Sequence, residues 1–426
     1  MKKVLIITYY WPPAGGPGVQ RWLKFVKYLR DFNVEPMVYV PENPEYPITD
    51  TTFENEIPDG IKIYKQKIFE PYTLAGIFSK KNTKRISSGI IQTTDQSLLE
   101  KALLWIRGNL FIPDARKFWV KPSVKYLQQL IEKEGIQTII TTGPPHSVHL
   151  IGMELRDRNT LQWIADFRDP WTSIGYHKKL KLTKNSQRKH LQLESKVLNK
   201  ADSIIVTSTI TKQEFTKITN KPITVITNGF DKVMGTSHKL DNTFTIAHIG
   251  SLLTGRNPKV LWQALKELTE ENADFKKELR LELIGIVSKD VLESIKNHGL
   301  QPYISLMGYV SHEKALERQQ SSQVLLLVEI DSEETKGIIP GKFFEYIKAE
   351  RPILGVGPQG WEVAQMISET NTGSAYTYKD SVGIKNQLLK WFRAYQKEEL
   401  NVKSRHIEKY SRRELTGKLA KVITWE

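Results

Sequence analysis

The feature that most constrains the fold is the alternation of apolar runs with helical segments that begins at residue 2. Residues 2–9 and 34–40 are apolar runs, and between them residues 14–18 are rich in glycine and residues 19–32 have the spacing of an amphipathic helix. Strand, loop, helix and strand in this order predict a βαβ unit with a right-handed crossover. The chain is therefore expected to begin as a parallel α/β sheet.

The glycine-rich loop differs from the dinucleotide-binding fingerprint. Gly15, Gly16 and Gly18 are interrupted by a proline, and no acidic residue ends the second strand where a ribose would be bound. Dinucleotide binding is therefore not expected. The loop is interpreted as one that lets a substrate approach the backbone.

The same alternation restarts after Asn228, with further apolar runs at 243–249, 281–284, 304–307 and 324–328. A chain of 426 residues is too long for one hydrophobic core. The sequence therefore predicts two Rossmann-like, doubly wound α/β domains, residues 1–228 and residues 229–404.

Several apolar runs of the first half end in residues that suit a binding site. His146 follows the run at 138–142, and Arg168 and Asp169 follow the run at 163–165. Ligands of parallel α/β sheets bind beyond the carboxyl ends of the strands. These three residues are therefore candidates for a ligand site, and a lone histidine such as His146 is more often an ordinary hydrogen-bonding residue than a catalyst.

The segment 337–360 carries the strongest local pattern. Pro340 and Gly341 form a turn before a predicted helix at 343–349, and an apolar strand is predicted at 352–356. The first amides of such a helix can bind an anion, and Lys342 adds a cation. Glu345 could accept hydrogen bonds from both hydroxyls of a ribose. In the alternative interpretation, Lys342 and Glu345 are simply solvated on an amphipathic helix.

Composition and charge restrict the class of protein. With 39% hydrophobic and 26% charged residues, the chain has the composition of a soluble globular protein. No apolar run approaches the length of a membrane-spanning helix, and the start lacks a signal-peptide cleavage site. The absence of cysteine excludes disulfides, cysteine-ligated zinc and thiol catalysis, and it fits a cytoplasmic protein.

The net charge of +15 comes from 62 basic and 47 acidic residues. Residues 76–125 carry ten Lys or Arg against three Asp or Glu, and residues 176–200 carry eight against one. Trp, Leu and Phe interleave the first of these stretches, which is typical of a peripheral protein at an anionic membrane surface, here the inner face of the cytoplasmic membrane. Solvated helix faces are the alternative. Nucleic acid is not expected, because no known binding module is present.

The sequence resembles the GT-B glycosyltransferases, specifically glycosyltransferase family 4, over essentially its whole length. The similarity is strongest at 228–231, 250–257 and 337–360. It implies two doubly wound domains that face each other across a cleft. It also implies a hexosyltransferase that moves a sugar from UDP-sugar or GDP-sugar to a hydroxyl of a glycan or lipid-linked acceptor in cell-envelope biosynthesis. The anomeric configuration would be retained, with no cofactor and no metal.

The resemblance also assigns residues. Glu345 matches the second glutamate of the family's Glu-x7-Glu motif, which holds the donor ribose, whereas the first glutamate is replaced by Gly337. Ser251 stands where the family has an arginine, and Arg256 falls at the position of its lysine. The implied donor-binding set is Gly15, Gly16, Ser251, Arg256, Gly341, Lys342, Phe343 and Glu345. The implied catalytic set, beside the reacting sugar and the acceptor, is His146, Arg168 and Asp169.

Alternatives remain at the level of function. The missing first glutamate and Ser251 leave open a carbohydrate-binding or scaffold protein without catalysis, and a nucleotide-sugar epimerase is the other alternative. The C-terminal residues 405–426 have approximately helical spacing. They are expected to pack back on the first domain, or alternatively to lie on a membrane.

Overall fold

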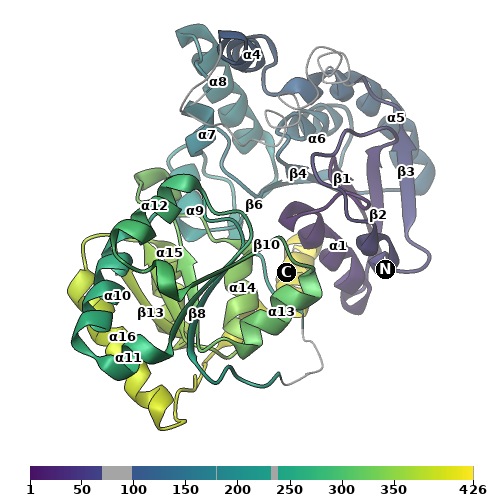
Figure 1. Cartoon of the computed structure of the whole chain (residues 1–426). Helices are drawn as coiled ribbons and strands as arrows, with labels where there is room; N and C mark the ends of the chain where they lie inside the picture. Colours follow the sequence, from purple (N-terminus) through teal and green to yellow (C-terminus); the bar gives the residue numbers. More distant parts are fainter. Residues whose placement is uncertain (70–97, 179, 232–237, 426) are drawn as a thin grey trace. The chain divides into compact units, whose positions relative to one another are not determined.

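A computed structural model describes residues 1–69, 98–178, 180–231 and 238–425 (Figure 1). It divides the chain into two compact units. The first unit comprises Met1–Asn228 together with Arg412–Glu426, and the second comprises Gly229–Ser411. The segment that returns to the first unit thus begins at residue 412, later than the expected residue 405.

The described part of the first unit contains a seven-stranded parallel sheet in the order β3-β2-β1-β4-β5-β6-β7. Its strands are β1 (Lys2–Thr8), β2 (Val34–Pro41), β3 (Lys62–Gln66), β4 (Thr138–Gly143), β5 (Gln162–Phe167), β6 (Ser203–Val206) and β7 (Ile223–Val225). Its helices are α1 (Pro17–Leu29), α4 (Leu98–Leu110), α5 (Val120–Glu134), α6 (Ser147–Arg158), α7 (Gly175–Lys178), α8 (Lys184–Lys200), α9 (Thr209–Phe215) and α17 (Arg412–Thr424).

The described part of the second unit contains a six-stranded parallel sheet in the order β10-β9-β8-β11-β12-β13. Its strands are β8 (Phe244–Ile249), β9 (Leu279–Ile284), β10 (Ile304–Gly308), β11 (Val324–Val328), β12 (Ile353–Gly357) and β13 (Gly373–Thr377). Its helices are α10 (Lys259–Glu271), α11 (Ala273–Glu278), α12 (Lys289–Asn297), α13 (His312–Ser321), α14 (Gly341–Lys348), α15 (Glu362–Thr370) and α16 (Ser381–Gln396).

Both sheets are covered by helices on both faces, which explains why their central strands read as continuous apolar runs. In β1, Val4 and Ile6 face the core that includes α1, while Leu5 and Ile7 face the core that includes α5 and α6. In each unit the strand order reverses beside the first strand, between β1 and β4 and between β8 and β11. Such a reversal is the switch point at which α/β folds bind their ligands.

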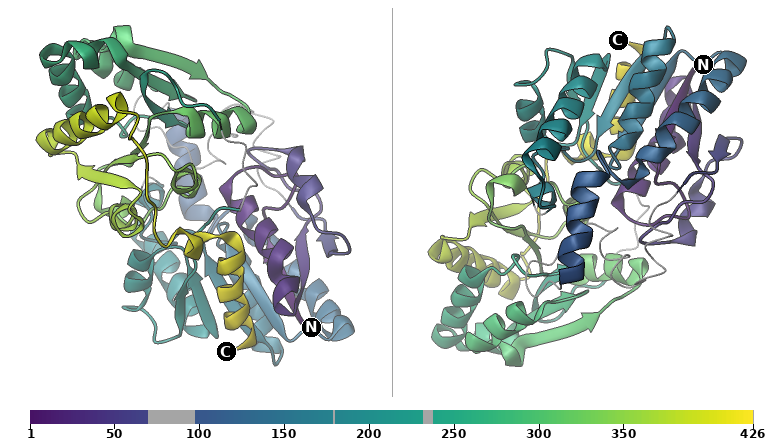
Figure 2. Two further views of the ribbon diagram at one scale, coloured as in Figure 1. Left: turned by 90° about the horizontal axis from the view of Figure 1, so that it is seen from below. Right: turned by 90° about the horizontal axis from the view of Figure 1, so that it is seen from above.

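The C-terminal helix α17 completes the first unit. Its apolar side chains Leu415, Leu419 and Ile423 are buried in the same core as Val4 and Trp22. Figure 2 shows α17 lying beside α1, which it contacts along its length. The structure therefore favours packing on the first domain over the alternative of a membrane-bound tail helix.

Two edge strands, β3 and β13, were not predicted. Residues 41–75 are rich in Pro, Glu and Tyr and predict an irregular stretch, but β3 pairs with β2 at the edge of the first sheet, with Lys62 opposite Met37. Three of its five residues, Lys-Ile-Tyr-Lys-Gln, are lysine or glutamine, which an edge strand tolerates because it is only partly covered. The remaining residues of that stretch, from 70 onward, lie outside the described residues. No helix in the described ranges is both long and apolar enough to cross a membrane.

Candidate functional site

The predicted donor-binding residues of the second unit gather where β8 and β11 end. The chain leaves β8 through Gly250, whose φ of +117° favours glycine. A Cβ atom at this position would lie 2.5 Å from the Nζ atom of Lys342. The loop after β8 and the start of α14 therefore meet at Gly250, and the missing side chain leaves room for the lysine.

Helix α14 is fixed against the end of β8 by Tyr346. The fully buried Tyr346 hydroxyl accepts a hydrogen bond from the backbone N–H of Ile249 at 3.0 Å. The helix begins at Gly341, after Pro340, without a side-chain cap. Its first turn can therefore offer backbone N–H groups to an anion, as the sequence predicts for Gly341.

The Lys342 ammonium is partly buried in this corner. Burial lowers the pKa of Lys342 to about 8, and repulsion from Arg256 acts in the same direction. Glu329 and Glu345 oppose this effect by attraction. Burial disfavours the charged form of Lys342, so an anion bound beside the ammonium would stabilise that form.

Arg256 is held by a carboxylate that sequence analysis did not single out. Its Nη2 and Nε atoms donate to Oε1 of Glu329 at 2.8 and 3.1 Å. Glu329 is almost completely buried at the end of β11, and the same oxygen accepts from the backbone N–H of Ile330. The sequence could have indicated Glu329 as a site residue, because it directly follows the apolar run at 324–328.

Glu345 is also positioned by a partner from another helix. Its Oε2 atom accepts a hydrogen bond at 2.8 Å from Nε2 of Gln319, a buried residue of α13. One carboxylate oxygen is thereby fixed by the protein. The half-buried carboxylate keeps further lone pairs with which it could accept from neighbouring hydroxyls of a ligand.

The side chains of Phe343 and Ser251, both of the predicted donor set, lie in different environments. Phe343 is fully buried and packs edge-on against Phe344, so its ring belongs to the core between α14 and the sheet. Its backbone N–H bonds to the carbonyl of Pro340. Ser251 follows Gly250 and is exposed, so its short side chain remains accessible.

The second unit therefore brings together Arg256, Lys342, Glu345 and the first turn of α14. Two cations and uncapped amides suit a diphosphate, because the charge-assisted hydrogen bonds they make are strong. A carboxylate one helical turn further on suits a pair of hydroxyls. This combination of chemical groups matches a nucleoside diphosphate.

In the first unit, the glycine loop lies beside Arg168. The backbone N–H of Gly15 donates to the carbonyl of Ile48 at 2.9 Å, and Gly16 begins α1 with a φ of +98°. A Cβ atom at Gly18 would overlap with the guanidinium of Arg168. The glycines therefore allow the start of α1 to approach the end of β5.

Arg168 is tied to the end of β4. Its backbone N–H and its Nε atom both donate to the carbonyl of Gly143, at 3.0 and 3.2 Å, and its Nη2 atom donates to the carbonyl of Pro144. Asp169 follows in the chain, and burial raises the pKa of its carboxyl group while the Arg168 charge lowers it. The two predicted residues thus share one strand end.

His146 lies in an aromatic stack. Its ring is parallel to that of Trp171, with 4.9 Å between the centroids, and only 5% of the residue is exposed. Burial lowers the pKa of His146 well below its usual range. The imidazole is therefore neutral at physiological pH, and its part in catalysis stays a prediction.

Two further polar residues of this region are structural. Asp166 is fully buried and accepts from Arg21, Trp22 and Thr142 at 2.8–2.9 Å. His149 is fully buried, with its Nδ1 atom 2.9 Å from the hydroxyl of Thr141. Asp166 joins α1 to β4 and β5, and so supports the strand ends that carry the candidate residues.

Within the described ranges, no three His, Asp or Glu side chains come together as metal ligands would. The expectation of a metal-independent reaction stays a prediction.

Comparisons with known proteins identify the fold. No family model matches the sequence, and no curated protein matches it. Similar solved structures include a glycosyltransferase from Rickettsia africae ESF-5, with 13% identity, a TM-score of 0.60 and coverage of 99% of this chain and 98% of that chain. Anabaena HepE in complex with UDP-glucose has 13% identity, a TM-score of 0.58 and coverage of 100% of both chains.

A variant of S. aureus TarM in complex with fondaparinux, α-GlcNAc-glycerol and UDP has 13% identity, a TM-score of 0.59 and coverage of 99% of both chains. The chain therefore has the GT-B fold, as predicted. Membership of glycosyltransferase family 4 stays a prediction.

The buried, neutral His149 predicts how stability depends on pH. Burial lowers its pKa from 6.5 to about 3. Between these values the unfolded chain binds a proton that the folded chain does not, so stability is lost as the pH falls through this window. We expect the unfolding free energy of His149→Asn, measured by urea denaturation between pH 7 and pH 4, to fall less steeply than that of the wild type.

The matched control is His312→Asn, because His312 is exposed on α13. Its slope should equal that of the wild type. Equal slopes for His149→Asn and the wild type would show that His149 does not remain neutral in the folded protein.

Proposed function

We propose that the protein is a retaining glycosyltransferase that moves a sugar from a nucleoside-diphosphate sugar to an acceptor hydroxyl. The observation that carries this proposal is the group formed by Arg256, Lys342, Glu345 and the first turn of α14 at the switch point of the second sheet. The GT-B fold supports it, because the structurally similar proteins include glycosyltransferases.

The reaction would break the bond between the anomeric carbon and the diphosphate and form one between this carbon and the acceptor oxygen. The acceptor proton would pass to the departing diphosphate. Negative charge grows on that leaving group, and Lys342, Arg256 and the amides of α14 would stabilise it. Such groups commonly contribute about 3 kcal/mol each to the lowering of a barrier.

We assign the acceptor to the first unit. Arg168 and Asp169 are the proposed contacts with the acceptor or the transferred sugar, because they extend from the end of β5 beside the glycine loop. His146 would act only as a neutral hydrogen-bonding group, because burial lowers the pKa of its imidazole. Both of its ring nitrogens lack a hydrogen-bond partner within the described structure. Glycans or lipid-linked glycans of the cell envelope are the proposed acceptors.

The structural neighbours guide the choice of donor. HepE was solved with UDP-glucose and TarM with UDP. These ligands support uridine nucleotides as the first to be tested, with guanosine nucleotides as the second. Gly337 replaces a family glutamate near the sugar, so the transferred sugar is not assigned.

Thermal-shift and calorimetric titrations with UDP and GDP test the donor site. A ligand at a hundred times its Kd stabilises the folded state by about 2.7 kcal/mol. We expect one of the two diphosphates to stabilise the wild type, and Glu345→Ala to weaken its binding by about 10- to 100-fold, because hydrogen bonds to a carboxylate are lost.

Glu293→Ala, on the exposed surface of α12, is the matched control and should bind like the wild type. If neither diphosphate binds, a scaffold without donor binding replaces the proposed enzyme. If a diphosphate binds but the corresponding UDP- or GDP-sugars only change configuration and are not transferred, the epimerase alternative is correct.

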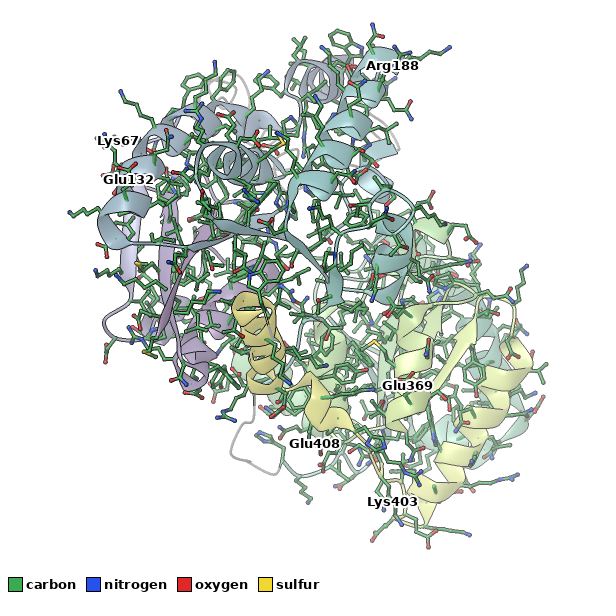
Figure 3. All side chains as sticks on the ribbon, turned by 180° about the vertical axis from the view of Figure 1, so that it is seen from behind. Lys67, Glu132, Arg188, Glu369, Lys403 and Glu408 are labelled. Carbon is green, nitrogen blue, oxygen red and sulfur yellow. The ribbon has the colours of Figure 1, made fainter. Side chains whose placement is uncertain are left out.

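We also propose that the first unit contacts an anionic membrane surface. Trp105, Ile106 and Leu110 of α4 are 43, 36 and 55% exposed. The buried side of this helix end packs on the segment before α8, where Asn109 bonds to the backbone of residues 181 and 183. Figure 1 shows α4 and α8 together, and Figure 3 shows Arg188 on α8 at the surface.

Basic and aromatic side chains surround this face. Lys117 lies over the rings of Phe111 and Phe118, and Phe118, which is 44% exposed, also contacts Phe69. Exposed basic residues of the adjoining segment and α8 are Lys181, Lys184, Arg188 and Lys189. Exposed aromatic rings beside lysines are the features with which peripheral proteins bind anionic lipids, and this would place the protein at the inner face of the cytoplasmic membrane.

Co-sedimentation with vesicles tests this surface. We expect binding to vesicles that contain phosphatidylglycerol, weaker binding at high salt, and little binding to pure phosphatidylcholine. The double variant Trp105→Ser with Leu110→Ser should weaken binding by about tenfold or more. Val382→Ser, at an apolar position on α16 that is even more exposed, should not. Indifference to lipid charge would contradict the proposal.

A further inference from the structure

A histidine lies inside an otherwise apolar strand next to the proposed donor site. His248 is the fifth residue of β8 and is only 1% exposed. A polar ring in such a place must find hydrogen-bond partners, because an unpartnered buried polar group is costly. The proposed reaction has given this residue no role.

The two central strands of the second sheet part at this residue. The ladder between β8 and β11 ends with Leu325 opposite Ala247. By contrast, β8 stays paired with β9 up to Ile249, and β11 stays paired with β12 up to Val328. The Nδ1 atom of His248 lies 3.0 Å from the carbonyl oxygen of Leu326, so the side chain bridges the two strands where their backbones separate.

This contact fixes the protonation of the imidazole. A carbonyl oxygen can only accept, so Nδ1 carries the proton and donates it. Burial and the neighbouring Lys342 charge lower the pKa of His248 well below its usual range, so the ring stays neutral. The Nε2 atom is therefore an acceptor, and it lies 3.4 Å from the Nζ atom of Lys342.

We infer that His248 is a positioning residue that holds the Lys342 ammonium at the switch point, where it meets the diphosphate. Lys342 has a flexible side chain with several rotatable bonds, and within the described residues no carboxylate forms a hydrogen bond with it. Glu329 is hydrogen-bonded to Arg256, and Glu345 to Gln319. The neutral imidazole directs the ammonium without cancelling its charge.

This arrangement differs from an ion pair in its effect on an anion. A carboxylate partner would compete with the phosphate oxygens for the lysine, whereas a neutral acceptor leaves the full positive charge available. Gly250 completes the arrangement, because a side chain there would meet the Nζ atom of Lys342. The inference rests on the proposed function in so far as the anion is a nucleoside diphosphate.

Two substitutions separate positioning from packing. His248→Asn retains an amide N–H near Nδ1 that can bond to Leu326 but provides no acceptor at the position of Nε2. His248→Gln provides an acceptor near Nε2. By calorimetry with UDP and GDP, we expect His248→Asn to bind the diphosphate about tenfold more weakly than the wild type, which corresponds to one lost hydrogen bond to a charged group. His248→Gln should restore most of the affinity.

A double-mutant cycle tests whether the effect passes through Lys342. In a Lys342→Gln background, His248→Asn should cause no further loss of diphosphate affinity. A further tenfold loss in that background would overturn the inference, because His248 would then act independently of the lysine. Equal affinities of His248→Asn and the wild type would overturn it as well.

A measurement without nucleotide keeps the inference separate from the proposed function. The ¹⁵Nζ resonance of Lys342, assigned by its loss in Lys342→Arg, reports the titration of the ammonium. The lysine should lose its proton at a lower pH in His248→Asn than in the wild type and in His248→Gln, because an acceptor of the ammonium has been removed. Identical titrations would overturn the inference. If the titrations differ as expected but neither UDP nor GDP binds, His248 does position Lys342, and the proposed nucleoside-diphosphate donor is wrong.

Discussion

The proposed donor site of the second unit depends on the parting of β8 from β11. While the strands are paired, their backbone groups satisfy each other and leave no room for a ligand. Beyond Ala247 and Leu325 the ladder ends, and the chain turns away through Gly250 on one side and Glu329 on the other. Helix α14 is fastened to the same corner by Tyr346. The groups of the proposed donor site therefore lie on segments that begin where β8 and β11 separate.

Arg21, Arg256 and Lys342 have different kinds of partner. Asp166 neutralises the buried Arg21. Arg256 is partly neutralised in the same way by Glu329. Lys342 is different, because its hydrogen-bonding neighbour is a neutral imidazole. The remaining positive charge marks where an anionic ligand gains most, since burial has already removed part of the lysine's hydration.

Residues close together in the sequence were predictable, and residues joined by distant segments were not. Gly341, Lys342 and Glu345 lie within one helical turn and a half, so a local pattern reveals their common site. Glu329, Gln319 and His248 reach them from β11, α13 and β8, and the sequence does not show which side chains will meet across such distances. Phe343 shows the opposite limit, because its neighbours in sequence belong to the proposed donor site while its own ring faces the core. The strand β3 was missed because edge strands need few apolar residues.

The most direct test of the account is a crystal structure determined with UDP, and a second with GDP. We expect the diphosphate against the start of α14, within hydrogen-bonding distance of Lys342 Nζ and Arg256, with the ribose hydroxyls on Glu345. We also expect the imidazole of His248 to keep its contacts with Leu326 and Lys342. A nucleotide bound elsewhere in the second unit, with Lys342 and Glu345 unchanged and free of ligand, would contradict the central claim.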